Sequence, residues 1–141
     1  MKNLVIFGSR TLTDNRVIDI IEKTIKQLEI TRIITSGETS GVCEVARKYA
    51  ENNKLDLLVK FANNEKYAAG KYEHRCVSIL QESEFVLFIH DGVSKGTQNE
   101  IKMAKKMGKT IFYNKIDLLD EDEYSFNLDI NWNGIRQNKD I

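Results

Sequence analysis

The chain has 141 residues, with 21 Lys and Arg against 21 Asp and Glu, two cysteines, no proline and 41% hydrophobic residues. This length fits one compact domain, and the balanced charge excludes the basic surface expected of a duplex-DNA binder. The longest apolar runs are far shorter than the roughly 20 residues that span a bilayer, and the first run stops at Gly8, too early for a signal peptide. Two cysteines provide no disulfide framework, so we expect a reduced, cytoplasmic protein with no membrane partner.

Short apolar runs alternate with segments of helical periodicity along most of the chain. The first predicted strand covers 4–7, and a helix follows Asp14, a good N-cap residue, and reaches residue 28. The pattern continues with strands over 30–35, 55–60, 85–90 and 110–113 and helices over 42–50, 72–80 and 97–107. Apolar strands separated by single helices are typical of parallel sheets covered on both faces. The sequence therefore predicts an α/β fold, a Rossmann-like doubly wound sheet of about five mainly parallel strands.

The periodicity decays after Lys115. An acidic stretch over 117–123 is followed by a segment rich in asparagine, whose large apolar residue is Trp132. We expect residues 1–115 to form the domain, and 116–141 to form a C-terminal extension that packs on the domain or on a partner subunit.

Small and polar residues follow three of the predicted strands. In an open parallel sheet, ligands bind beyond the carboxyl ends of the strands, and a helix N-terminus there attracts phosphate through its unpaired N–H groups and its dipole. Glycine in a strand-to-helix turn can also be present only because the backbone turns tightly there. These segments contain neither a Walker A motif nor the three-glycine dinucleotide fingerprint. Three such segments at one edge nevertheless favour a small phosphate-bearing ligand. They are Gly8-Ser9-Arg10, Ser36-Gly37-Glu38-Thr39-Ser40-Gly41 and Asp91-Gly92-Val93-Ser94-Lys95-Gly96-Thr97.

Taken in order, these segments resemble the SLOG superfamily, the group of Smf/DprA and lonely-guy phosphoribohydrolases, and most closely its YspA-like branch. The resemblance spans roughly residues 3 to 113. It also includes Ala68-Ala69-Gly70 with His74-Arg75, and Gly108-Lys109 after Ala104.

This resemblance implies a Rossmann-like domain that binds nucleotide-derived ligands. Members of the superfamily include enzymes that hydrolyse the N-glycosidic bond of nucleoside monophosphates and sensors of ADP-ribose-type signals in bacterial antiviral immunity. Gly96-Thr97-Gln98-Asn99-Glu100 keeps part of the lonely-guy motif, and Arg75 matches its arginine. The implied ligand-binding residues are Gly8, Ser9, Arg10, Ser36, Gly37, Glu38, Ser40, Gly41, Arg75, Asp91, Gly92, Ser94, Lys95, Gly96, Thr97 and Glu100.

Departures from the family pattern favour binding over catalysis. YspA-like members usually have an acidic residue where Cys43 stands, and an asparagine where Cys76 stands. Lonely-guy enzymes have adjacent glycines where this chain separates Gly92 from Gly96.

Several side chains have two interpretations. Glu100 fits a catalytic carboxyl, but with Thr97 it also fits a capping box at a helix start. Arg75 fits a phosphate fork or a solvated helix charge. Tyr67 and Tyr72 fit base stacking or the core.

Histidine and cysteine carry weaker signals. We expect His90 to be structural rather than a general base. Buried inert thiols are a better interpretation of Cys43 and Cys76 than a zinc site.

Our leading hypothesis is a protein that binds ADP-ribose, cyclic ADP-ribose or another signalling nucleotide without turnover. Such a protein could sequester a signal in the host cytoplasm as a phage antagonist of immune signalling. The alternative is a nucleoside 5′-monophosphate phosphoribohydrolase that uses Glu100 and Arg75. Single-stranded DNA binding is the least favoured, because the net charge is zero. We predict no cofactor or metal, and the resemblance implies a homodimer or a higher homo-oligomer.

Overall fold

The computed structural model describes residues 2–62 and 70–117. Their strands form one parallel sheet in the order β3-β2-β1-β4-β5. The fold class predicted from the sequence is therefore confirmed. The elements are β1 (Asn3–Gly8), α1 (Asn15–Leu28), β2 (Arg32–Ser36), α2 (Val42–Asn52), β3 (Asp56–Lys60), α3 (Lys71–Leu80), β4 (Phe85–His90), α4 (Lys95–Lys106) and β5 (Thr110–Lys115).

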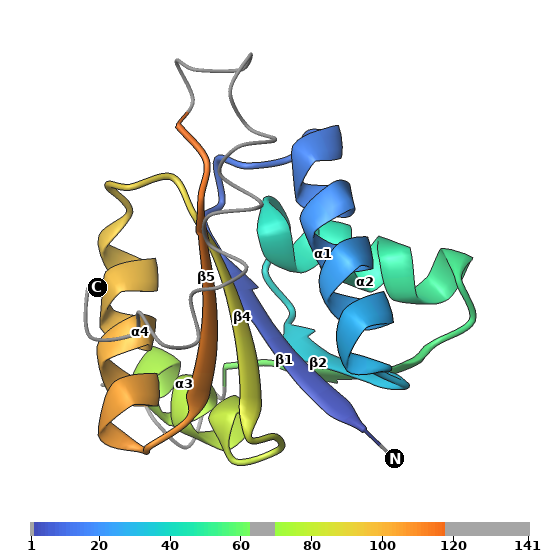
Figure 1. The fold of residues 1–141 in the computed structure, drawn as a ribbon. Helices are drawn as coiled ribbons and strands as arrows, with labels where there is room; N and C mark the ends of the chain where they lie inside the picture. Colours follow the sequence, from blue (N-terminus) through green and yellow to red (C-terminus); the bar gives the residue numbers. More distant parts are fainter. Residues whose placement is uncertain (1, 63–69, 118–141) are drawn as a thin grey trace.

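The two faces of the sheet are covered by different helices (Figure 1). Alternate residues of each strand point to opposite faces, so neighbours such as Ile6 and Phe7 belong to different apolar clusters. Ile6 packs in the cluster formed with α1 and α2. Phe7 packs in the cluster formed with α3 and α4, where its ring stacks on Phe88 at 5.8 Å between centroids. Burial on both faces explains why the central strands are continuously apolar.

The start of α4 differs from the sequence prediction. Asp91 accepts hydrogen bonds from the backbone N–H groups of Val93 and Ser94, at 2.9 and 2.8 Å. This turn leads the chain into a helix at Lys95, two residues before the expected start. Thr97 consequently lies inside the first turn, and the interpretation of Thr97 and Glu100 as a capping box is wrong.

The chain after β5 begins inside the domain. Ile116 is fully buried in the cluster under α1 and α2, and Arg16 donates to the backbone carbonyl of Asp117 at 3.4 Å. Tyr67, Ala68, Ala69 and Trp132 lie outside the described residues, as does the rest of the expected extension. Within the described part of the chain, no helix is both long and apolar enough to cross a membrane.

Candidate functional site

The central strands β1 and β4 are neighbours, and the chain leaves them toward opposite edges of the sheet. This is the switch point at which open α/β sheets bind ligands. The loops after the two strands are locked together by polar contacts. The N–H of Ser9 donates to Ile89 at 3.0 Å, the N–H of Asp91 donates to the Ser9 hydroxyl at 3.0 Å, and the Thr11 hydroxyl donates to Asp91 at 2.8 Å.

The loop between β2 and α2 is closed by packing. Gly41 has a φ of 84°, and a Cβ there would lie 2.3 Å from the Cα of Arg10. The N–H of Val42 donates to the carbonyl of Ser9 at 3.2 Å. A Cβ on Gly37 would enter the ring of Phe61, at 2.1 Å from a ring carbon. Both glycines therefore permit close packing, and the start of α2 abuts the protein's own backbone.

The loop between β4 and α4 is organised around Asp91. Burial raises the pKa of Asp91, but hydrogen bonds from Ser94, Val93 and Thr11 outweigh it and hold the pKa well below its ordinary value. Both ring nitrogens of His90 have partners within the protein, which agrees with the expected structural role. They are the hydroxyl of Tyr113 at 2.9 Å and the carbonyl of Ser94 at 3.1 Å.

The N-terminus of α4 is open by comparison. Ser94 occupies the N-cap position, but its hydroxyl donates to Asp91 at 2.7 Å and does not cap the helix. The first turn contains no acidic residue. Gly96 and Thr97 of this turn line a cavity of about 220 Å³. A helix terminus with these properties favours an anion.

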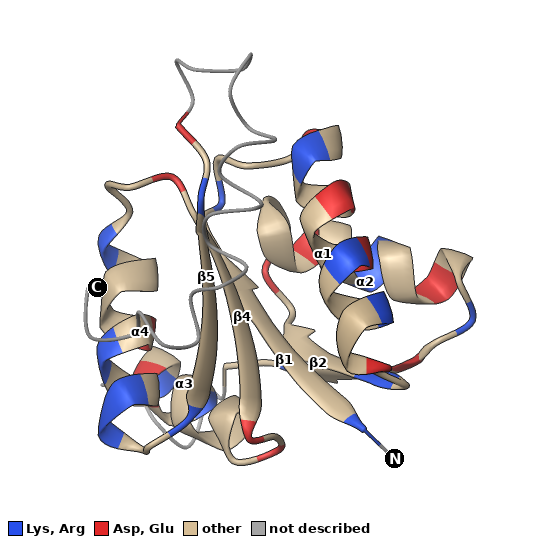
Figure 2. Ribbon diagram, viewed as in Figure 1, with Lys and Arg blue, Asp and Glu red and all other residues tan. Residues whose placement is uncertain are grey.

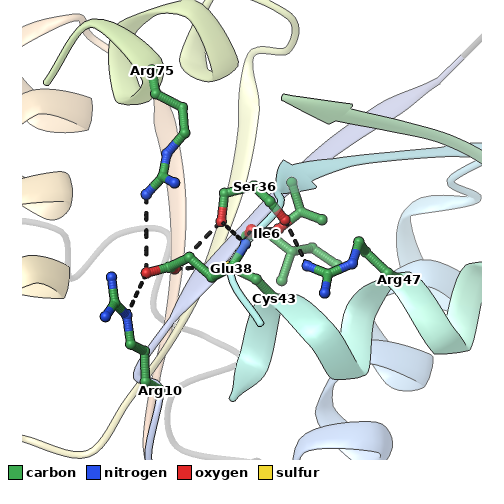
Figure 3. A network of polar contacts seen from close by, with 8 residues as sticks. Ile6, Arg10, Ser36, Glu38, Cys43, Arg47 and Arg75 are labelled. Atoms are coloured by element: carbon green, nitrogen blue, oxygen red, sulfur yellow. Dashed lines mark hydrogen bonds and ion pairs between the residues drawn. The ribbon is translucent and has the colours of Figure 1, made fainter. Parts of the chain in front are cut away.

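Two arginines converge on the carboxylate of Glu38, which also lines this cavity (Figure 3). The Nε atom of Arg10 lies 2.6 Å from Oε2 of Glu38, and Nη2 of Arg75 lies 3.9 Å from the same oxygen. The Glu38 and Arg75 side chains are 12% and 9% exposed, whereas that of Arg10 is 66% exposed. With Glu100, these residues form what we call the charge cluster: Arg10, Glu38, Arg75 and Glu100.

The other oxygen of Glu38 is held from the opposite side. The Ser36 hydroxyl donates to Oε1 at 3.3 Å, and the Cys43 thiol lies 3.5 Å from it. Arg47 donates from α2 to the carbonyl of Ser36 at 2.7 Å, which fixes the end of β2 (Figure 3). Glu38 is thus positioned by two neighbouring elements.

A larger cavity of about 520 Å³ lies beside the smaller one. The two share Arg10, Glu38, Gly96 and Glu100, so three members of the charge cluster stand between them, and the fourth, Arg75, lines the larger cavity. The other residues of the larger cavity come from α3 and α4: Tyr72, Glu73, Arg75, Cys76, Asn99, Lys102, Met103 and Lys106. The smaller cavity is completed by Gly8, Ser9, Thr11, Ser94 and Thr97.

The electrostatics of the larger cavity favour an anion. Burial and the Glu38 carboxylate raise the pKa of Glu100 to about 8, against the opposing effect of Arg75 and Arg10. Glu100 is therefore mostly protonated at neutral pH. Four cationic side chains then face two carboxylates in the lining. Figure 2 shows the basic residues along α4, which supplies Lys102 and Lys106.

Arg75 is incompletely satisfied. Its Nε atom is buried and has no hydrogen-bond partner among the described residues. Its distance to Glu38 exceeds a hydrogen bond. Its guanidinium lies 5.1 Å from the centre of the Tyr72 ring, and that tyrosine is 54% exposed at the cavity. Arg75 is a buried cation in the cavity wall, not a solvated helix charge.

The thiols are buried and unreactive. Burial raises the pKa of Cys43 to about 11 and that of Cys76 to about 12, so both are protonated at neutral pH. Both are free cysteines, and the described residues contain no cluster that could hold a metal ion.

The structure brings together nine of the sixteen ligand-binding residues that the resemblance implies. These line one or both cavities: Gly8, Ser9, Arg10, Glu38, Arg75, Ser94, Gly96, Thr97 and Glu100. The other seven line neither of these two cavities: Ser36, Gly37, Ser40, Gly41, Asp91, Gly92 and Lys95. Two of these seven support the lining: the Ser36 hydroxyl donates to Glu38, and Asp91 accepts from the N–H of Ser94 in the turn before α4.

One face of α4 was missed by the sequence reasoning. Asn99, Lys102, Met103 and Lys106 line the larger cavity. Their spacing of three and four residues places them on one helix face, which is a detectable signal. Nothing in the sequence indicated Thr11 either, because no local pattern predicts the hydrogen bond from its hydroxyl to Asp91.

Comparison with known proteins supports the fold. No family model and no curated protein sequence matches the chain. A similar solved structure is the molybdenum cofactor binding protein from the phototrophic bacterium Rippkaea orientalis, with a TM-score of 0.61 and 20% identity. The match covers 93% of this chain and 86% of that protein. At this identity, the likeness concerns the fold alone.

Proposed function

We propose that the protein binds a phosphate-bearing, nucleotide-derived small molecule at the charge cluster. The observation that carries this proposal is Arg75, a buried guanidinium in the wall of the larger cavity whose Nε–H has no acceptor among the described residues. Buried N–H groups are nearly always paired, so this one points to a ligand that supplies the acceptor. Arginine forks suit phosphate oxygens particularly well.

The two cavities suit different parts of such a ligand. The smaller one combines the open α4 terminus with the hydroxyls of Ser9 and Thr97, which suits a phosphate. The larger one has the ring of Tyr72 and the thioether of Met103 in its wall, which suits a flat base. Arg10 lines both cavities and Arg75 lines the larger one, so together they suit a second phosphate between the two, as in a nucleoside diphosphate. The Glu100 carboxyl beside them suits a sugar hydroxyl.

Within this ligand class we propose ADP-ribose and cyclic ADP-ribose first, following the resemblance to SLOG sensor domains. A phage-encoded protein that binds such a signal without cleaving it would antagonise bacterial immune signalling by sequestration. A homodimer or higher oligomer is likewise implied by the resemblance and is measured by sedimentation.

The direct test is to identify what the purified protein carries. The protein is denatured by heat, and the released small molecules are analysed by mass spectrometry. Calorimetric titration then compares ADP-ribose, cyclic ADP-ribose and AMP, together with the molybdenum cofactor named for the structural neighbour. We expect at least one phosphate-bearing nucleotide to bind. No heat with any nucleotide, from a sample shown to be folded, would remove the proposal.

A second candidate is a nucleoside monophosphate phosphoribohydrolase. The observation in its favour is Glu100, whose raised pKa of about 8 keeps a proton available at neutral pH beside Arg75. A protonated carboxyl is suited to assist departure of a base, as a general acid, rather than to activate water. Incubation with AMP and chromatography for free base tests this candidate. Activity that survives Glu100→Gln would exclude the assigned role.

A further inference from the structure

Glu38 lies where an anionic ligand of the charge cluster would lie. Its Oε2 atom is 2.6 Å from Nε of Arg10 and 3.9 Å from Nη2 of Arg75. Figure 3 shows the two guanidinium groups approaching this oxygen from different elements. A phosphate oxygen between two arginines would occupy the same place.

The carboxylate supplies Arg75 with a countercharge but not with a hydrogen bond. The 3.9 Å separation is too long for one, and Nε of Arg75 remains unpaired among the described residues. Arg10 is largely exposed, so its contact with Glu38 is open to water and to competing anions. The arrangement is a weak internal complex that a better anion can replace.

The backbone of Glu38 cannot move far when its carboxylate is displaced. Arg47 holds the carbonyl of Ser36, and the N–H of Gly37 donates to the carbonyl of Lys60 at 3.1 Å. The N–H of Glu38 itself donates to the Ser36 hydroxyl at 3.4 Å. A displaced carboxylate would therefore remain close to the bound anion and to Glu100, which shares both cavities. Its negative charge then opposes every anion that enters.

We propose that Glu38 is a specificity-determining residue, which competes with the ligand's phosphate for Arg10 and Arg75; this inference rests on the proposed function. Inorganic phosphate gains attraction from the two guanidinium groups, but repulsion from the displaced Glu38 carboxylate cancels this gain. It therefore binds poorly. A nucleotide also fills the larger cavity against Tyr72 and Met103, and this additional contact drives the exchange. The site consequently selects phosphate that is attached to a ring system over the free anion.

The test measures the affinity for inorganic phosphate by calorimetry at neutral pH and constant ionic strength. Glu38→Gln keeps the shape and an oxygen acceptor for Ser36 but removes the charge. Glu44→Gln is the matched control, because it removes the same charge from α2, where Glu44 pairs with Lys48 at 3.8 Å and lies outside both cavities. We expect Glu38→Gln to bind phosphate at least about tenfold more tightly than the wild type, and Glu44→Gln to change the affinity by less than about twofold.

The inference is overturned if Glu38→Gln binds phosphate no better than the wild type, or if Glu44→Gln gains as much. Thermal unfolding with phosphate or chloride gives a second readout, because removing Glu38 leaves Arg75 without its countercharge. A rise in melting temperature with phosphate alone, larger in Glu38→Gln than in the wild type, supports the inference; equal shifts oppose it. These results stand apart from the proposed function, which fails only if no nucleotide binds the wild type.

Discussion

The two glycine-containing loops at the carboxyl edge of the sheet have similar composition and opposite roles. In the loop between β2 and α2, Gly41 packs against the backbone of Arg10, and the N–H of Val42 is bonded to Ser9. After the loop between β4 and α4, a Cβ on Gly96 would meet no atom within 4 Å, and this glycine lines both cavities. A glycine-rich strand-to-helix turn is thus evidence of an anion site only when its amides are unoccupied.

The largest effect that tests this contrast is expected at Gly41. Gly41→Ala forces a side chain onto a φ of 84° and against backbone atoms of Arg10 and Ser9, which cannot shift without opening the β1 loop. Strain and overpacking together should lower the free energy of unfolding by about 2–4 kcal/mol. Urea denaturation followed by circular dichroism measures it. A loss below about 0.5 kcal/mol would show that this loop is not closed by packing.

The fold was predictable because each element has its own local signal. The central strands are apolar throughout, as burial on both faces demands, and Asp14 caps α1 by accepting from the N–H of Arg16 at 3.0 Å. The start of α4 was placed two residues late, because the bonds from Val93 and Ser94 to Asp91 depend on a turn that has no periodicity.

The candidate site was predictable only in part. Topology alone brings the loops after β1 and β4 together, so Arg10 and Gly96 could be placed at one edge. The pairing of Arg10 and Arg75 with Glu38 joins residues that lie 28 and 37 positions from it in the chain. No local pattern encodes such a contact, since it depends on how α3 packs beside the end of β2.

The next largest effect is expected at Arg75, on ligand affinity at the cavities beside α4. Arg75→Lys keeps the charge but loses the planar guanidinium, whose central carbon lies 5.1 Å from the centre of the Tyr72 ring. We expect the affinity for a phosphate-bearing nucleotide to fall about tenfold to a hundredfold, measured by calorimetry. Arg32→Lys, at the start of β2 and outside both cavities, is the matched control for replacing a guanidinium by an ammonium group and should leave the affinity within about twofold. Equal affinities in wild type and Arg75→Lys would place the ligand elsewhere.

Gly96→Ala is the counterpart of Gly41→Ala and should behave in the opposite way. The added methyl group meets nothing within 4 Å, and alanine favours the helix, so stability should rise by up to about 1 kcal/mol. The same methyl group enters the space shared by the two cavities. We therefore expect a nucleotide to bind about three- to tenfold more weakly. Unchanged binding in this more stable variant would argue against an anion at the α4 terminus.

The smallest expected effect is a pH dependence of ligand binding at the cavities beside α4. Glu100 has a pKa of about 8, with Glu38, Arg75 and Arg10 as its charged neighbours, so raising the pH from 7 to 9 adds a negative charge inside the cavity. Nucleotide affinity should then fall several-fold in the wild type and stay level in Glu100→Gln, as measured by calorimetry at each pH. The free energy of unfolding should also fall as the pH rises. The folded protein keeps the Glu100 proton up to about pH 8, whereas the unfolded chain releases it near pH 4.5, so the stability contributed by Glu100 is lost between these two values. An affinity that falls equally in both proteins would assign the titration to another group.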